Sequence, residues 1–291
     1  MRFLVTADWH IRGTVPSCVD ATPKEWMNLQ KEALRNLLRI AEENAVQEIL
    51  VGGDLFHSDA STTFECIHML QHFALACHDK GIEFWVMAGN HDLPYHSSEN
   101  ISKSAIGVLM GSDEVKHMHF NSHCKGSDFD IEDYGDAEVI FKHVLCIPRE
   151  DKPDFIDCKT PDELLSDYPH ARLIFTGDYH KNFVYEQDGR KVVNSGCLLR
   201  QAIDFRDYDP GVYVVDTSDD SAVFHSVRVE QKFTEDRDIK KERDEMIETF
   251  VNGISRQEVT LDFISSLKHE AEKQNPSIKE KVEEWIESSG Q

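Results

Sequence analysis

The chain has 291 residues, which is enough for one large α/β domain or for one domain with an appendage. Its hydrophobic content of 40% is ordinary, and no stretch approaches the ~20 consecutive apolar residues of a membrane-spanning helix. The formal net charge of −23 is strongly acidic and, taken alone, weighs against nucleic-acid binding because a polyanion is repelled. Metal-binding carboxylates are included in this charge, and bound cations would offset part of it.

Cysteine usage and the amino terminus bear on where the protein works. The seven cysteines are scattered without a C-x-x-C pair, which predicts reduced, mostly buried thiols and argues against a zinc site made of cysteine. The chain enters an apolar run at residue 2, so we expect no signal peptide. Together these features predict a cytoplasmic protein that does not contact membranes.

The amino-terminal part of the chain predicts alternating strands and helices. In chain order the strand, helix, strand, helix and strand are expected at residues 2–7, 24–44, 48–51, 63–79 and 82–87. The first helix should begin at Thr22-Pro23, because proline is favoured in the first helical turn. This order predicts parallel strands with helices on the faces of the sheet.

Beyond residue 92 the elements are shorter and the patterns weaker. Short helices are expected at 102–110 and 161–167, and strands at 115–120, 128–131, 138–142 and 172–176. Asp188-Gly189 predicts a hairpin between the runs at 183–187 and 191–194. A second antiparallel pair is expected at 211–216 and 222–229. The carboxyl half of the core is therefore predicted to form a sheet that is largely antiparallel.

The character of the chain changes after Glu230. Three charged segments with helical spacing follow, at 234–250, 256–274 and 277–287. Their apolar stripes are too narrow for independent domains, which indicates helices that pack on the core or on a partner. We therefore predict a first domain at 1–230 and a helical region at 231–291, which either caps the core or binds a partner.

Five apolar runs end in carboxylate, imidazole or amide side chains. The endings are Asp8 and His10; Asp54 and His57; Asn90, His91 and Asp92; His143; and Asp178 and His180. In open α/β sheets, ligands bind outside the carboxyl ends of the strands. Five endings of this kind in one chain predict a single polar site.

The side chains at the first three endings are metal ligands by type. Asp8 and His10 are two residues apart, which places both on one side of an extended strand. A carboxylate with an imidazole suits Mn²⁺, Fe²⁺ or Zn²⁺ better than Mg²⁺. Asp54 can place its two oxygens on two different ions, and Asn90 offers a neutral carbonyl oxygen.

The remaining endings complete the predicted chemistry. His143, Asp178 and His180 would fill two coordination shells, and two ions ~3.5–4 Å apart favour attack of ionised water on phosphorus. If Asn90 is a ligand, its neighbour His91 is placed to protonate the leaving oxygen. His57 contacts either the substrate or a ligand, and the sequence leaves these two roles open.

The motifs that carry these residues resemble those of a known family. D-W-H (8–10), G-G-D-L-F-H (52–57), G-N-H-D (89–92) and G-D-Y-H (177–180), in this order, resemble the calcineurin-like metallophosphoesterases. The resemblance spans residue 1 to about residue 229. It implies an α/β fold, a four-layer α/β/β/α sandwich, to which this chain adds a helical extension, and a dinuclear centre that is often manganese.

The resemblance also implies a role for each residue. One ion would be held by Asp8, His10, Asp54 and His180. The other would be held by Asp54, Asn90, His143 and Asp178. His91 would be the catalytic histidine, with His57 beside it. The family usually has G-H-x-H where this chain has Asp178, a competent Mn²⁺ ligand that adds a negative charge.

Two segments are similar to the SbcD-like branch of double-strand-break-repair nucleases. They are G-G-D-L-F-H with its His57, and the Asn-Ser-Gly-Cys-Leu-Leu-Arg run at 194–200. This similarity implies a Mn²⁺-dependent DNA exonuclease and endonuclease of repair or recombination, of bacterial or phage type. Its partner would be an SMC-like, SbcC-type ATPase bound through the carboxyl-terminal helices, and a homodimer is left open.

Two other functions stay open on the sequence. A metallophosphoesterase acting on a small molecule or a phosphoprotein is favoured by the net charge of −23. A non-enzymatic scaffold would have lost metal ligands, whereas only Asp178 departs from the family pattern. The nuclease is favoured by G-G-D-L-F-H and by the helical region.

Overall fold

The computed structural model describes residues 2–94, 98–117, 129–131, 139–153, 156 and 158–234. The chain divides into two compact units, Met1–Phe233 and Thr234–Gln291. The helices expected within 231–291 lie outside the described residues, as does the end of the strand expected at 115–120. None of the described helices has the length and apolar character that a membrane span requires.

The first sheet has the strand order β11-β10-β1-β2-β3-β4. Its strands are β1 (Arg2–Thr6), β2 (Glu48–Gly52), β3 (Glu83–Met87), β4 (Val115–His117), β10 (Gly211–Asp216) and β11 (Ser221–Ser226). Strands β1 to β4 are parallel to one another, and β10 is antiparallel to both β1 and β11. The predicted parallel pairing of the first three strands is therefore confirmed.

The second sheet has the strand order β5-β6-β7-β9-β8. Its strands are β5 (Phe129–Ile131), β6 (Val139–His143), β7 (Leu173–Thr176), β8 (Phe183–Gln187) and β9 (Arg190–Asn194). The predicted hairpin at Asp188-Gly189 joins β8 to β9, with left-handed φ angles of 53° and 75° at its two turn residues. Strands β6, β7 and β9 are parallel to one another.

Most of the described helices begin where their sequences predict, but the helix expected at 102–110 begins at Ala105. Helix α1 (Pro23–Glu43) is capped by Thr22, whose hydroxyl accepts from the Glu25 backbone N–H while the Glu25 carboxylate accepts from the Thr22 N–H. Helix α2 (Phe64–Asp79) is capped by Thr63 in the same region of backbone space. The shorter α3 (Ala105–Leu109) and α4 (Pro161–Asp167) follow.

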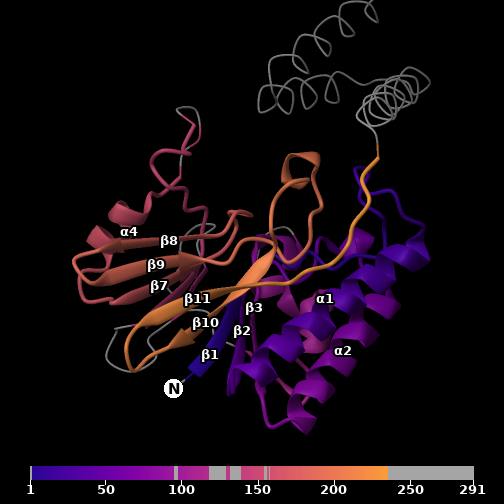
Figure 1. Cartoon of the computed structure of the whole chain (residues 1–291). Helices are drawn as coiled ribbons and strands as arrows, with labels where there is room; N and C mark the ends of the chain where they lie inside the picture. Colours follow the sequence, from indigo (N-terminus) through magenta and orange to yellow (C-terminus); the bar gives the residue numbers. More distant parts are fainter. Residues whose placement is uncertain are drawn as a thin grey trace, which may run out of the picture. The chain divides into compact units, whose positions relative to one another are not determined.

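An apolar core between the two sheets holds them face to face. Phe3, Leu50 and Met87 of the first sheet pack with Phe141 and Phe175 of the second, and all five are at most 4% exposed. Figure 1 shows α1 and α2 on the outer side of the first sheet and α4 on the outer side of the second. The predicted α/β/β/α sandwich is therefore confirmed for the described residues.

The prediction of a largely antiparallel sheet in the carboxyl half was wrong. Strands β10 and β11 do not join the second sheet. They extend the first one, in which Val215 lies opposite Phe3. In the second sheet the hairpin supplies β9, which pairs in parallel with β7. The local turns were predicted correctly, but their partners are chosen by the core between the sheets, where Tyr213 and Val215 pack against both layers.

Candidate metal centre

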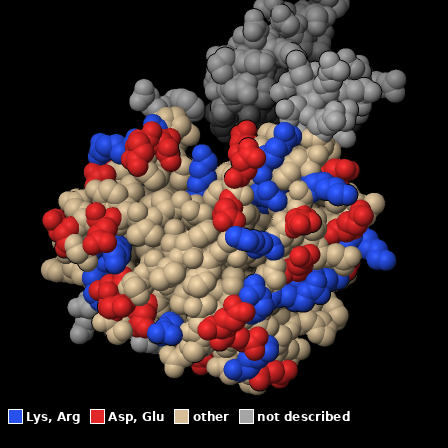
Figure 2. Space-filling model, in the orientation of Figure 1, with Lys and Arg blue, Asp and Glu red and all other residues tan. Residues whose placement is uncertain are grey.

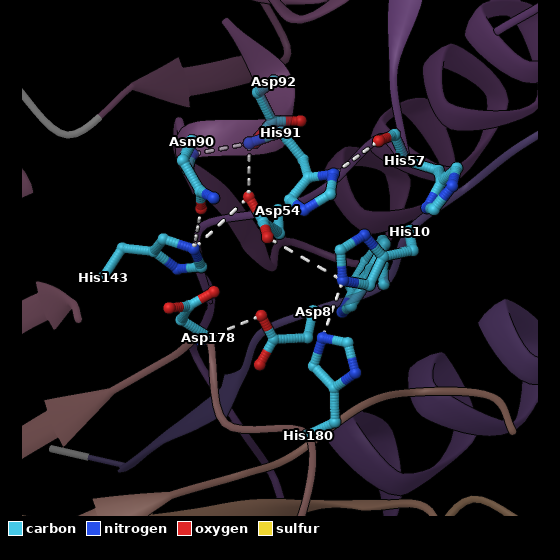
Figure 3. Close-up of polar contacts among 12 residues, drawn as sticks. Asp8, His10, Asp54, His57, Asn90, His91, Asp92, His143, Asp178 and His180 are labelled. Atoms are coloured by element: carbon cyan, nitrogen blue, oxygen red, sulfur yellow. Dashed lines mark hydrogen bonds and ion pairs between the residues drawn. The ribbon is translucent and has the colours of Figure 1, made fainter. Parts of the chain in front are cut away.

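The carboxyl ends of strands from both sheets meet at one edge of the sandwich. Side chains of the loops that follow β1, β2 and β3 in the first sheet face His143 at the end of β6 and the loop that follows β7 in the second (Figure 3). The structure brings together the residues singled out in the sequence, namely Asp8, His10, Asp54, His57, Asn90, His91, His143, Asp178 and His180. All the strand endings with polar side chains therefore contribute to one site.

Backbone pairing continues past the ends of β1 and β2 and aligns the first ligands. The N–H of Asp8 donates to the carbonyl of Gly53 (3.1 Å), and the N–H of His10 donates to the carbonyl of Asp54 (3.0 Å). This extra pairing holds the two loops in register outside the sheet. Asp8, His10 and Asp54 are each at most 4% exposed as a result.

The backbone is strained at four of these positions. Asp8, His10, Asp54 and Asp178 have left-handed φ angles of 53°, 45°, 53° and 72°. Such conformations cost about 1–3 kcal/mol each in residues other than glycine, and they persist only where the surrounding structure enforces them. Here they turn the carboxylates and imidazole toward a common centre, which the strand pattern alone does not predict.

Asp8, His10 and His180 form one group of nearby ligand atoms. The Nε2 atoms of His10 and His180 lie 2.9 Å apart and face each other. Both nitrogens cannot carry a proton in this arrangement, so at least one lone pair is directed at its neighbour. A cation between these rings and the Asp8 carboxylate would satisfy both nitrogens.

Asp54 joins this group to a second one. Its Oδ2 lies 3.7 Å from His10 Nε2, and its Oδ1 lies 3.3 Å from His143 Nε2. His143 Nε2 is also 3.0 Å from Asn90 Oδ1. The Asp178 carboxylate points toward His143 and Asp8, and its backbone N–H donates to Asp8 Oδ1 at 3.0 Å (Figure 3).

The electrostatics of the centre are those of a crowded set of buried acids and bases. Burial raises the pKa of Asp8 to about 6. Burial opposes ionisation of Asp54, but His143 and His10 outweigh it and hold the pKa of Asp54 below its ordinary value. Burial likewise opposes the charge on His143, but Asp54, Asp8 and Asp178 raise its pKa to about 10. Burial lowers the pKa of His10 well below its ordinary value.

Unpartnered atoms at the centre test whether these residues fit metal ions. Asp8 Oδ2, Asp54 Oδ2 and His10 Nδ1 are buried and have no hydrogen-bond partner among the described residues. Leaving a buried donor or acceptor unsatisfied costs ~1–3 kcal/mol, and more for a charged group. Carboxylate oxygens and imidazole nitrogens are ligands of divalent ions, so bound ions would remove this cost from the two carboxylates. The residues therefore fit a metal centre.

Two glycines give His143 and Asp54 the space they occupy. A side chain on Gly53, whose φ is +102°, would collide with the ring of His143. A side chain on Gly89 would collide with the Asp54 carboxylate and lie 2.8 Å from His143 Nε2. Gly89 itself has an extended backbone, with φ of −95° and ψ of −177°. Glycine is required there for close approach to the ligands and not for a special backbone angle.

The structure gives Asp92 a role that the sequence analysis missed. Asp92 is 2% exposed, and its carboxylate accepts backbone N–H bonds from Gly89 (2.8 Å), Leu55 (3.1 Å) and Phe56 (2.7 Å). It therefore ties the loop after β2, which carries Asp54, to the loop after β3, which carries Asn90 and His91. In the sequence, the feature that could have indicated this role is the place of Asp92 at the end of G-N-H-D.

The segment after β9 braces the same loops from the other side. The N–H of Cys197 donates to the carbonyl of His180 (3.0 Å). The side-chain amide of Gln201 donates to the carbonyls of Trp9 and His10, each at 3.1 Å. The run at 194–200 therefore supports ligand-bearing backbone instead of supplying ligands.

His57 and His91 lie at the outer rim of the centre. The His57 ring lies 5.5 Å from that of His10 and 5.6 Å from that of His91, measured between ring centroids. The hydrogen bond between the two residues uses the His57 backbone, because its carbonyl accepts from His91 Nδ1 at 2.8 Å. His57 thus orients His91 through its main chain, while its own half-buried ring faces His10 and His91.

Comparison with known proteins agrees with this geometry. The calcineurin-like phosphoesterase family matches residues 1–215, and the chain belongs to that family. It is a metallophosphoesterase by family, with Asp and His groups that can bind divalent metal. No curated protein sequence matches it.

Two solved structures are similar to this chain. One is an archaeal phosphodiesterase, 12% identical, covering 78% of this chain and 99% of its own, with a TM-score of 0.43. The other is Yfce, a phosphoesterase from E. coli, 13% identical, covering 78% of this chain and 100% of its own, with a TM-score of 0.38.

The role of Asp92 can be tested by Asp92→Asn. The side-chain amide of asparagine accepts hydrogen bonds only through its oxygen, so its NH₂ group cannot replace the second carboxylate oxygen. We therefore expect the free energy of unfolding to fall by about 1–3 kcal/mol. Weaker divalent-metal binding should accompany the loss, because the loops carrying Asp54 and Asn90 are no longer tied together. Urea unfolding and metal titration measure the two effects.

The matched control is Asp167→Asn, which removes an exposed ion pair to Lys159. That pair is expected to contribute about 0–1 kcal/mol. Equal stability and metal affinity in the two variants would show that Asp92 does not hold the loops.

Proposed function

We propose that this chain is a Mn²⁺-dependent phosphodiesterase of the SbcD-like type that cleaves DNA in repair or recombination. The observation that carries the metal-dependent chemistry is Asp54, whose two oxygens face two different groups of buried ligands. Mixed carboxylate and imidazole ligands favour Mn²⁺ over Mg²⁺. The choice of DNA as substrate rests on G-G-D-L-F-H and on the run at 194–200, both of which are similar to that nuclease branch.

In this proposal the ligands divide into two sets that share Asp54. Asp8, His10 and His180 complete the first set, and Asn90, His143 and Asp178 complete the second. Two divalent ions, when bound by these ligands, would supply Lewis acidity toward the phosphoryl oxygens and would lower the pKa of water at the site. Asp178, in the place where the family usually has histidine, adds a negative charge to the second set.

His91 is proposed to hold the proton that the leaving oxygen receives. The His57 carbonyl can only accept, so Nδ1 of His91 carries its own proton in the bond between them. The exposed ring therefore presents Nε2 as the nitrogen that exchanges a proton with substrate. The His91 backbone N–H donates to Asp54 Oδ1 at 3.0 Å, which keeps the residue beside the ligands whatever its side chain.

The alternative substrate is a small phosphate ester or a phosphoprotein. It is favoured by the net charge of −23 and by the face shown in Figure 2, on which Lys and Arg side chains are interspersed with Asp and Glu. DNA binding requires that cations gather close to the centre or that a partner supplies them.

Cleavage assays on one preparation separate these substrates. We expect plasmid nicking and degradation of linear DNA with Mn²⁺, and bound metal near two ions per chain. p-Nitrophenyl phosphate esters are tested beside the DNA. Strong hydrolysis of the esters with intact plasmid would point to the small-substrate alternative, and absence of both activities with metal bound would remove the enzyme proposal.

His91→Ala is expected to lower hydrolysis by about 10²–10⁴-fold, as loss of a general acid does, while metal content stays unchanged. The backbone N–H that contacts Asp54 survives the substitution, so the ligands keep their arrangement. His170→Ala, which alters an exposed histidine ahead of β7, is the matched control. Full activity in His91→Ala would remove His91 from the mechanism.

We further propose that residues 231–291 bind an SMC-like ATPase of the SbcC type. The test is a truncation after Thr234, which retains the pairing of Val19 with Phe233 and the bond from the Asp20 N–H to the Lys232 carbonyl (3.0 Å). We expect the full chain to co-purify with the ATPase and the truncated chain to lose this association while keeping ester hydrolysis. Undiminished association would contradict the proposal, and the mass of the complex would reveal whether the chain is dimeric.

A further inference from the structure

Arg12 is a cation placed beside the metal centre. It is two residues beyond His10 on the same segment, which pairs with the segment carrying His57 through the bridge between Ile11 and Phe56. The N–H of His57 donates to the carbonyl of Ile11 at 3.1 Å. Arg12 therefore lies next to His57, whose ring faces both His10 and His91.

Side chains of α1 bind the main chain of Arg12 through three hydrogen bonds. Gln30 of α1 is fully buried, and both ends of its amide bind Arg12: its Oε1 accepts from the Arg12 N–H (3.0 Å), and its Nε2 donates to the Arg12 carbonyl (2.9 Å). Trp26 Nε1 donates to the same carbonyl at 3.1 Å. The buried amide of Gln30 and the indole of Trp26 thus fix the position of the Arg12 main chain.

The guanidinium, in contrast, has little to bind. Its Nε donates to Thr14 Oγ1 at 2.9 Å, and in the described part of the chain no carboxylate forms an ion pair with it. Some other arginines of this acidic protein have such partners, as in Arg2 with Asp216 and Arg149 with Asp162. A half-buried cation without an acidic neighbour is costly.

The position of Arg12 brings a cation to the rim of the centre, because its main chain lies two residues from His10 and beside His57. The two Nη groups of Arg12 are the donors that bind phosphate oxygens in a bidentate manner.

We propose that Arg12 binds the phosphate group adjacent to the scissile one, so that the site selects substrates with at least two linked phosphates, as in a polynucleotide. This inference rests on the proposed phosphodiesterase function and names the substrate feature that the centre recognises. It also supplies a local cation in a chain whose net charge of −23 opposes polyanions. Arg12 is thus a specificity residue, because it acts on a phosphate that is not cleaved.

The test compares binding of thymidine 3′,5′-bisphosphate and thymidine 5′-monophosphate by calorimetry to the Mn²⁺-loaded full chain. We expect wild type to bind the bisphosphate about tenfold more tightly than the monophosphate. Arg12→Ala should lose this preference and keep its affinity for the monophosphate, whereas Arg12→Lys should retain part of it. Arg35→Ala, an exposed arginine of α1, removes the same charge elsewhere and should behave like wild type.

A thermal unfolding curve shows whether each variant is folded. If Arg12→Ala is not folded, Arg12→Lys is compared with wild type in its place. No preference in wild type, or an unchanged preference in Arg12→Ala, would overturn the inference. Equal losses in Arg12→Ala and Arg35→Ala would also overturn it, because the effect would then be general electrostatics. Preference for the bisphosphate without DNA cleavage would leave the inference standing and remove the proposed nuclease.

Discussion

Asp54 lies fully buried between the two halves of the site, and each of its carboxylate oxygens faces a different histidine. This arrangement depends on β2 ending between β1 and β3 in the first sheet and opposite β6 of the second. The core of Phe3, Phe141 and Phe175 fixes the distance between the sheets, and with it the distance between Asp54 and His143. The apolar contacts of the sandwich thereby set the geometry of a polar centre.

Holding the ligands in place is unfavourable for the fold taken alone. Carboxylates and imidazoles are buried with unpartnered atoms, and four of the residues have strained backbone angles. The structure offsets this with hydrogen bonds to the backbone of the loops around the centre. Asp92 gathers three backbone N–H groups, and Gln201 donates to two carbonyls on the opposite side. Bound cations, which these ligands fit, would remove much of the remaining cost.

The strongly negative charge of the chain shapes what the centre can accept. A phosphate substrate approaches a protein that repels it at long range, so recognition depends on short-range cations. Metal ions bound at the carboxylates would be one such source, and Arg12, held by Gln30 and Trp26, would be another in the role proposed above. Cations close to the centre would therefore allow a phosphate to bind to a chain whose net charge is −23.

Much of this protein was determined by its sequence alone. The apolar runs, the Thr22 cap, the Asp188-Gly189 hairpin and the polar endings of five strands are local features, because they follow from the periodicity and turn chemistry of neighbouring residues. Convergence of the first three endings also followed from the sequence, since parallel strands share a carboxyl edge. The endings of the second sheet reach the same site because the two sheets pack face to face.

The tertiary structure decided what local chemistry cannot. It moved β10 and β11 into the first sheet, because strand pairing depends on which faces share a core. It gave Asp92 its three backbone donors and Gly89 its close contacts, and it placed Gln30 of α1 against Arg12. These contacts join residues between 3 positions apart (Gly89 and Asp92) and 214 positions apart (Arg2 and Asp216), and the long-range ones depend on packing that no short stretch of sequence encodes.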